Sequence, residues 1–125
     1  MVESYEKQKE NAYIFLRIKY ADLQKISDGQ FSIYDFLNNL FPKSKIKQNL
    51  ALKIFEELKK EPCTFKMLLQ RLGAKKSTLF GVCLALLRSG LINRKTKREP
   101  FVLSNSFASI IREYSYWWER WMGQR

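Results

Sequence analysis

Histidine is absent from this chain of 125 residues, and cysteine occurs only twice, as Cys63 and Cys83. Histidine is the commonest general base in enzymes and the commonest metal ligand in proteins. Two cysteines without histidine do not complete a four-ligand zinc site unless carboxylates or a second chain contribute. No pair of carboxylates suggests acid–base chemistry. We therefore expect a protein that is not an enzyme and that holds neither a metal nor another cofactor.

Long hydrophobic runs are lacking as well. The longest uncharged apolar run, residues 79–87, has nine residues, whereas a membrane-spanning helix needs about 20. Residues 1–10 are charged and polar, which does not fit a secretory signal, and two cysteines do not form a disulfide framework. The sequence thus favours a protein of the reducing cytoplasm without a membrane span.

Acidic residues are scarce in one part of the chain only. The whole chain has 23 Lys and Arg against 12 Asp and Glu, a formal net charge of +11. Residues 43–98 carry a net charge of +12, residues 1–42 a net charge of −1 and residues 99–125 a net charge of 0. A basic protein that is merely soluble needs no such segregation, whereas a surface that binds a polyanion does, because neutralised phosphates release condensed counterions. The middle block therefore points to nucleic acid.

Helical periodicity dominates the chain, which has few Gly and Pro residues to interrupt it. We expect a capping box formed by Ser32 and Asp35 and left-handed helix ends at Gly73 and Gly90. The patterns predict helices over residues 3–27, 33–41, 65–72 and 75–89, a helix with an apolar face over 50–58 that ends at 59–60, and a last helix capped by residue 104 or 105. They also predict a bridging strand at 63–65, and two strands at 91–94 and 101–103 joined by a charged hairpin tip at 95–100.

The middle of the chain carries a specific motif. The spacing Leu-x-x-x-Leu-Gly-x-x-x-Ser-Thr-aliphatic, followed by apolar residues at helical spacing and then by Gly-Leu-Ile, is filled by Leu68, Leu72, Gly73, Ser77, Thr78, Leu79, Cys83, Leu86, Gly90, Leu91 and Ile92. This pattern resembles the DNA-binding half of winged helix-turn-helix regulators of the MarR and ArsR type and of their small archaeal relatives. The resemblance covers about residues 46–104, half of the chain.

The resemblance implies a mainly α-helical fold with a small two- to three-stranded β-wing. We expect a single domain over residues 1–125, with N-terminal interface helices in 1–42, the winged helix-turn-helix in 43–104 and a C-terminal aromatic interface helix in 105–125. The implied partner is double-stranded DNA of a chromosome, plasmid or virus. The implied function is that of a dimeric transcriptional regulator.

The second helix of such a motif enters the major groove of DNA, which admits one α-helix. Hydroxyls and free N–H groups in its first turn can hold a phosphate, and the wing reaches the adjacent minor groove or the backbone. The expected DNA-binding residues are Lys43, Lys45, Lys47, Lys75, Lys76, Ser77, Thr78, Phe80, Gly81, Arg88, Arg94, Lys95, Lys97 and Arg98.

The outward side of this helix departs from the family pattern. Phe80, Gly81, Leu84 and Ala85 stand where Arg, Gln, Asn, Ser or Lys are usual, and none of them can form a bidentate hydrogen bond to a base edge. Phe80 and Ala85 could touch thymine methyl groups. An exposed Phe-Leu patch equally fits an alternative function, a winged helix that binds a protein within a DNA-associated assembly for transcription or replication.

The two ends of the chain carry more apolar surface than a winged helix needs. We expect a homodimer interface made by Tyr13, Leu16, Tyr20, Tyr114, Trp117, Trp118 and Trp121, since two-fold dimers are the commonest oligomers. A platform for stacking single-stranded bases is the alternative for the C-terminal aromatic residues.

The cysteines allow two interpretations, a redox sensor or plain packing. Cys83 belongs to an apolar helical stripe and is expected in the core. The role of Cys63 stays open.

Overall fold

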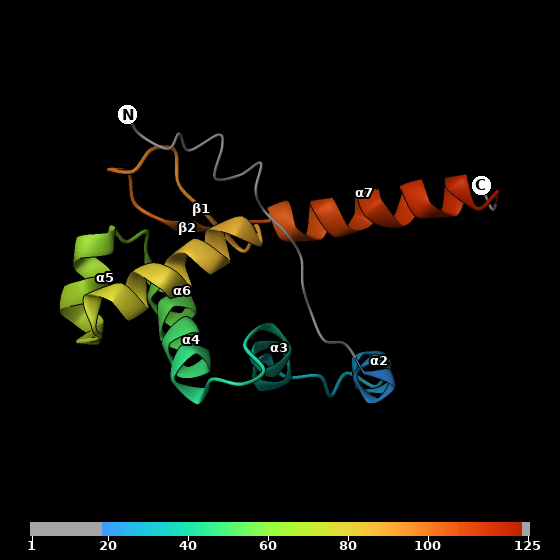
Figure 1. Ribbon diagram of the computed structural model, residues 1–125, viewed down its shortest axis with the longest axis horizontal. Helices are drawn as coiled ribbons and strands as arrows, with labels where there is room; N and C mark the ends of the chain where they lie inside the picture. Colours follow the sequence, from blue (N-terminus) through green and yellow to red (C-terminus); the bar gives the residue numbers. More distant parts are fainter. Residues whose placement is uncertain (1–18, 124–125) are drawn as a thin grey trace.

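The computed structural model describes residues 19–123, which form six helices and one small antiparallel sheet. This part of the chain is mainly helical, as the sequence predicts. In chain order (Figure 1) the elements are α2 (Tyr20–Ser27), α3 (Ile33–Leu40), α4 (Lys45–Lys60), α5 (Phe65–Leu72), α6 (Lys76–Arg88), β1 (Ile92–Asn93), β2 (Val102–Leu103) and α7 (Ser106–Trp121).

The hydrophobic core lies where α6 crosses α4 (Figure 1). Each helix contributes the apolar stripe that its periodicity predicts, and every member of both stripes is buried. They are Leu50, Ala51, Ile54, Phe55 and Leu58 of α4, and Leu79, Val82, Cys83, Leu86 and Leu87 of α6. Burial of one such Leu, Ile, Val or Phe side chain is worth roughly 1.5–3 kcal/mol. The crossing therefore fixes which side of α6 faces outward.

The segment between α4 and α5 ties both helices to the sheet. Cys63 forms an isolated antiparallel bridge with Phe101 through backbone hydrogen bonds of 3.2 and 2.8 Å. The bridging strand expected at 63–65 is therefore confirmed only at Cys63, because Thr64 caps α5 and Phe65 begins it. Arg71 of α5 donates to Glu57 at 3.1 Å and to Glu61 at 2.8 Å. These bonds hold the end of α4 against α5.

The turn between α5 and α6 depends on a glycine. Gly73 has a φ of 63°, in the left-handed region, which a residue without a Cβ adopts at little cost. Its N–H donates to the carbonyl of Leu69 at 3.3 Å and closes α5. The expected left-handed end at Gly73 is confirmed, and it allows α6 to leave α5 at a steep angle.

The sheet is shorter than the sequence predicts. β1 and β2 pair antiparallel with Ile92 opposite Leu103 and Asn93 opposite Val102. Of the residues expected in the strands, Leu91 precedes β1, and Arg94 and Phe101 belong to the segment that connects β1 to β2. We call this segment, residues 94–101, the wing loop.

The first predicted helix is partly wrong. Lys19 has an extended backbone, with φ −103° and ψ 159°, so α2 begins at Tyr20 and is not the end of one continuous helix over 3–27. The physical reason is that the Asp22 carboxylate accepts the Lys19 N–H at 2.9 Å, a capping interaction that favours a helix start here. The rest of the predicted helix lies outside the described residues.

Polar side chains fix α2 against α3. The predicted capping box of Ser32 and Asp35 is confirmed, with bonds of 2.9 and 3.3 Å. Lys25 reaches Asp35 at 3.1 Å, and Asn39 donates to the buried Asp22 at 3.1 Å. Backbone N–H groups that bond these two carboxylates lower the pKa of both.

The first turn of α7 packs against Gly90, and the rest of the helix projects away from the other elements (Figure 1). Gly90 has a φ of 79°, which confirms the expected glycine cap, and its carbonyl accepts the Phe107 N–H at 2.9 Å. The Phe107 ring meets Phe36 of α3 edge to face at 5.9 Å. No residue of α7 is fully buried, and Phe107 is half-buried.

Substitution of Gly90 tests the close approach of α7, and substitution of Gly81 tests the free space around the backbone of α6. A Cβ on Gly90 would lie 2.9 Å from the Phe107 nitrogen at a positive φ, so Gly90→Ala should lower the free energy of unfolding by about 1–3 kcal/mol. A Cβ on Gly81 within α6 would meet no atom within 4 Å, and Gly81→Ala should raise it by up to about 1 kcal/mol. Urea denaturation followed by circular dichroism measures both. A Gly90→Ala protein as stable as the wild type would contradict the close approach of α7.

Candidate nucleic-acid interface

Helix α6 and the wing loop enclose a hollow between them. We call it the α6–wing hollow; its volume is about 310 Å³. Helices α5 and α6 and the wing loop each contribute to its wall, which is formed by Phe65, Lys76, Phe80, Cys83, Leu84, Leu87, Arg94, Lys97 and Phe101. Apolar side chains therefore lie next to the lysines of two elements that are well separated in the sequence.

A second hollow lies at the start of α6. It measures about 510 Å³ and is lined by Phe65, Lys75, Lys76, Ser77 and Phe80. Phe65, Lys76 and Phe80 thus belong to both hollows. The rings of Phe65 and Phe80 meet edge to face, with centroids 6.2 Å apart, so the α5 ring supports the half-exposed α6 ring from one side.

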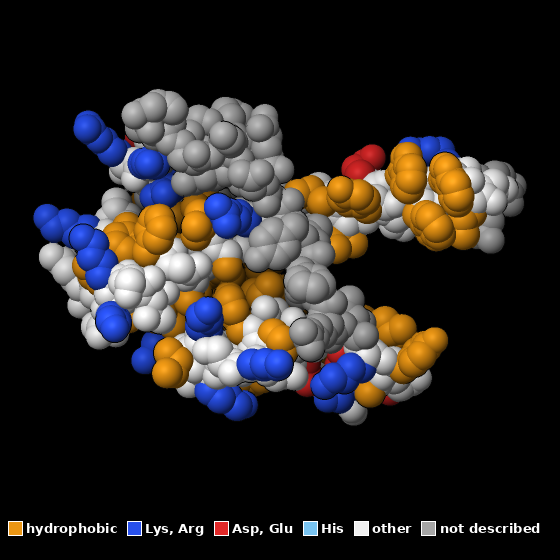
Figure 2. All heavy atoms as spheres, in the orientation of Figure 1, with side chains coloured by type: hydrophobic (Ala, Val, Ile, Leu, Met, Phe, Trp, Pro, Cys, Tyr) orange, Lys and Arg blue, Asp and Glu red, His pale blue; other side chains and the backbone are white. Residues whose placement is uncertain are grey.

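Basic side chains surround this surface. Figure 2 shows Lys and Arg spread over the half of the molecule that holds α4, α5, α6 and the wing loop, while Asp and Glu are visible mainly near α2 and on α7. Lys75, Lys76, Lys95, Lys97 and Arg98 are all exposed. The positive block of the sequence is therefore also a positive region of the folded surface.

The first turn of α6 offers free hydrogen-bond donors. The first N–H groups of a helix have no acceptor within the helix, and Lys75 at the N-cap supplies no side-chain cap. Ser77 is exposed and Thr78 is half-buried in the same turn. Together with the helix dipole, these groups can hold one phosphate.

Arg94 differs from the expectation of a wing contact. Its side chain is only 8% exposed, its guanidinium lies 4.6 Å from the centroid of the Phe101 ring, and it donates to the Lys97 carbonyl at 3.2 Å. Stacking on an aromatic face suits the weakly hydrated guanidinium. Arg94 therefore connects the start of the wing loop to Lys97 and to Phe101 at its other end, on the buried side of the loop.

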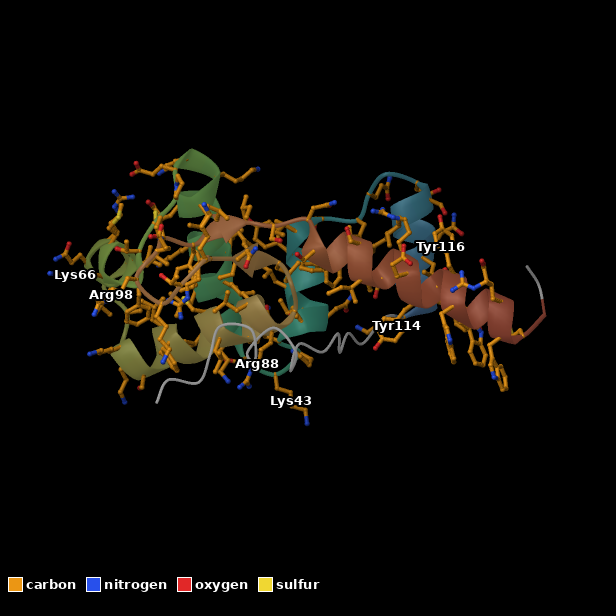
Figure 3. The ribbon with its side chains drawn as sticks, turned by 90° about the horizontal axis from the view of Figure 1, so that it is seen from above. Lys43, Lys66, Arg88, Arg98, Tyr114 and Tyr116 are labelled. Atoms are coloured by element: carbon orange, nitrogen blue, oxygen red, sulfur yellow. The ribbon has the colours of Figure 1, made fainter. Side chains whose placement is uncertain are left out.

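The lysines at the start of α4 lie apart from the wing loop. Figure 1 places the beginning of α4 and the wing loop on opposite sides of α6. Lys43 precedes α4, and Lys45 and Lys47 are exposed in its first turn, which Ser44 caps at 3.1 Å. Figure 3 shows Lys43 and Arg88 pointing out of the same side of the molecule. Cations thus flank α6 on both sides.

Two residues of this surface were not predicted. Phe65 lines both hollows, and Lys66 lies with Arg98 at the end of the molecule away from α7 (Figure 3). The sequence marks both only as members of a short helix. Their position beside α6 follows from the glycine turn, which sequence spacing does not describe in three dimensions.

The expected dimer residues fall into two groups. Tyr13 and Leu16 lie outside the described residues. Tyr20 of α2 is 92% exposed, and Tyr114, Trp117, Trp118 and Trp121 of α7 are 50–70% exposed. The Trp121 ring stacks on those of Trp117 and Trp118, with centroids 6.5 and 5.5 Å apart. Tyr114 and Tyr116 point to opposite sides of the helix (Figure 3).

Comparisons with protein-family models, with curated proteins and with solved structures gave no match to this chain. No helix among residues 19–123 has the length and apolar character needed to cross a bilayer. The same residues contain no cluster of three or more His, Cys, Asp or Glu arranged to hold a metal ion.

Both cysteines are buried, and this gives a direct test of the packing. Burial raises the pKa of Cys83 to about 12 and also raises the pKa of Cys63, so both are protonated thiols at pH 8. A thiol reagent such as DTNB should label the native protein only as fast as the chain unfolds, and should label both cysteines at once in 8 M urea. Rapid labelling of the native protein would contradict the buried position of Cys63 and would favour a redox role.

Proposed function

We propose that this chain is a winged helix-turn-helix protein that binds double-stranded DNA as a dimer and regulates transcription. The order α4, Cys63 bridge, α5, glycine turn, α6, β1, wing loop and β2 supports the winged-helix assignment. The observation that carries the proposal is the α6–wing hollow, in which Lys76 of α6 and Lys97 of the wing loop share one surface.

In this function α6 lies in the major groove. Lys75, Lys76 and the first-turn amides bind one phosphate strand, and Lys95, Lys97 and Arg98 of the wing loop bind the backbone beside the adjacent groove. Lys43, Lys45 and Lys47 contact phosphates on the other side of α6. Such contacts position a protein on the duplex and give a strongly salt-dependent affinity.

A second copy of the chain is the proposed occupant of the aromatic face of α7. A 16-residue helix without buried side chains is marginal in water, and burial of its exposed Tyr114, Trp117, Trp118 and Trp121 rings would stabilise it. The described part of this end is charge-balanced, with Arg112 and Arg120 against Glu113 and Glu119, so two copies can meet there without repulsion. The positive block, in contrast, repels its own copy.

Charge balance also weighs against single-strand stacking on α7. Proteins that bind single strands combine aromatic platforms with a positively charged groove along the backbone. The two arginines of α7 are offset by two glutamates, and the indole rings already stack on one another.

A dimer would place two copies of α6 about one turn of DNA apart, roughly 34 Å.

A second candidate function rests on Phe80, which is 51% exposed beside the partly buried Leu84. In this alternative the apolar centre of the α6 surface binds a partner protein in a DNA-associated assembly. Removal of the Phe80 and Leu84 side chains would then abolish partner binding and leave DNA affinity unchanged.

Neutralising the wing loop tests DNA binding. The variant Lys95→Gln/Lys97→Gln/Arg98→Gln should bind every duplex more weakly, and the slope of log Kd against log salt should fall by about one unit for each phosphate that the variant no longer neutralises. Fluorescence anisotropy across a salt series measures this slope. The matched control is Lys53→Gln/Lys59→Gln/Lys60→Gln on exposed positions of α4, which removes the same charge. Equal slopes in the two variants would contradict a role of the wing loop.

Charge placed on the aromatic face of α7 tests the dimer. Trp117→Glu/Trp121→Glu should convert the protein from a dimer to a monomer and weaken DNA binding, because a monomer holds the duplex through one copy of α6 instead of two. Light scattering gives the mass directly. The control Tyr116→Glu alters the opposite side of α7 and should leave the mass unchanged. A wild-type protein that is monomeric at micromolar concentration would contradict the proposed interface.

A further inference from the structure

The outward side of α6 lacks hydrogen-bonding groups at its centre. Between Ser77 and Arg88, which lie on the same side, the residues here are Phe80, Gly81 and Leu84. The core stripe of α6 fixes this orientation, since Leu79, Val82 and Cys83 are buried. These three residues cannot read the donors and acceptors of a base pair by direct side-chain hydrogen bonds.

One feature of the major groove suits an apolar side chain. Each base edge presents donors or acceptors there, but thymine also presents a C5-methyl group, which is apolar. Phe80 is 51% exposed, and the Phe65 ring supports it edge to face at 6.2 Å. A half-exposed ring braced in this way offers a fixed apolar surface to such a methyl group.

The charges around Phe80 favour DNA as the occupant. Phe80 lines both hollows; Lys75, Lys76 and Ser77 belong to one of them, and Lys76 and Lys97 belong to the other. Phosphates bound by these lysines would position the Phe80 ring close to the bases of the groove. A neutral apolar partner would instead leave the same lysines without counter-charges.

The neighbouring glycine leaves space for the groove edge. Gly81 is exposed, and a Cβ at this position would meet no protein atom within 4 Å. Its lack of a side chain therefore serves no packing contact among the described residues. Beside Phe80 it lets the backbone of α6 approach the bases closely.

We propose that Phe80 recognises the C5-methyl group of a pyrimidine in the major groove and so gives the protein a preference for thymine at that place. This inference rests on the proposed duplex binding through α6. The same contact accepts 5-methylcytosine, whose methyl group occupies the equivalent position. Unmethylated G·C pairs are disfavoured there, because the ring would strip water from their polar edges without replacing it.

The test compares duplexes that differ only in methyl groups. An A·T-rich duplex is made with thymine or with deoxyuridine throughout, and a G·C-rich duplex is made with cytosine or with 5-methylcytosine. Fluorescence anisotropy at one fixed salt concentration gives the four Kd values. Removal of one methyl group that Phe80 touches should weaken binding roughly four-fold, and removal of two, one for each copy in a dimer, should weaken it by up to about fifteen-fold.

Two variants assign the effect. Phe80→Ser should bind the thymine and deoxyuridine duplexes equally, because the methyl-sensing ring is gone; its half-exposed position lies outside the buried core, so the fold is retained. Tyr116→Ser, an exposed aromatic residue removed from α7, should keep the wild-type ratio. A change in duplex flexibility caused by deoxyuridine would alter the ratio of the two Kd values equally in the wild type and in Phe80→Ser, so the difference between their ratios reports the contact of Phe80 alone.

Each outcome bears on a different claim. Equal wild-type affinity for both A·T-rich duplexes would overturn methyl recognition while leaving duplex binding intact. A methyl effect that persists in Phe80→Ser would overturn the assignment to this residue. Absence of binding to all four duplexes would overturn the proposed function itself. Unchanged DNA affinity of Phe80→Ser, with no methyl effect, would overturn the inference in favour of a protein partner.

Discussion

The crossing of α6 over α4 is the packing contact from which the other features follow. Five apolar residues of α6 are buried there, and their side chains leave water together with the stripe of α4. Once that side of α6 is buried, its opposite side, with Phe80 and Leu84, must face outward. The wing loop is held to the same core, because the backbone of Phe101 pairs with Cys63 and Arg94 stacks on its ring. One core thus orients both parts of the candidate interface.

Charge adds a second constraint on what this molecule can bind and how it can associate. The block of residues 43–98 carries a net charge of +12, which repels another copy and attracts a polyanion. The described α7 is apolar on one side and balanced in charge, and it has no buried residue. A division into a nucleic-acid surface and a self-association surface satisfies both conditions, and this division underlies the proposed dimer on DNA.

Much of the local structure could be predicted because it depends on neighbouring residues. The capping box at Ser32, the positive φ of Gly73 and Gly90, and the buried stripes of α4 and α6 all follow from short-range spacing. The predictions failed where a single local bond or a distant partner decides the outcome. Asp22 caps Lys19 and starts a helix inside a segment without Gly or Pro. Arg94 appears in the sequence as one of several wing cations, yet the aromatic ring of Phe101 draws it beneath the loop.

Composition and spacing within a few residues are enough to predict the helical character, the turns at Gly73 and Gly90, the buried stripes of α4 and α6 and the segregation of charge. Which residues from different elements lie in contact becomes visible only once the helices are packed together. Phe65 braces Phe80, Lys76 shares a hollow with Lys97, and the lysines at the start of α4 lie across α6 from the wing loop. These relations depend on the angle at which two helices cross, and that angle is set by the packing of many side chains together, which no short pattern encodes.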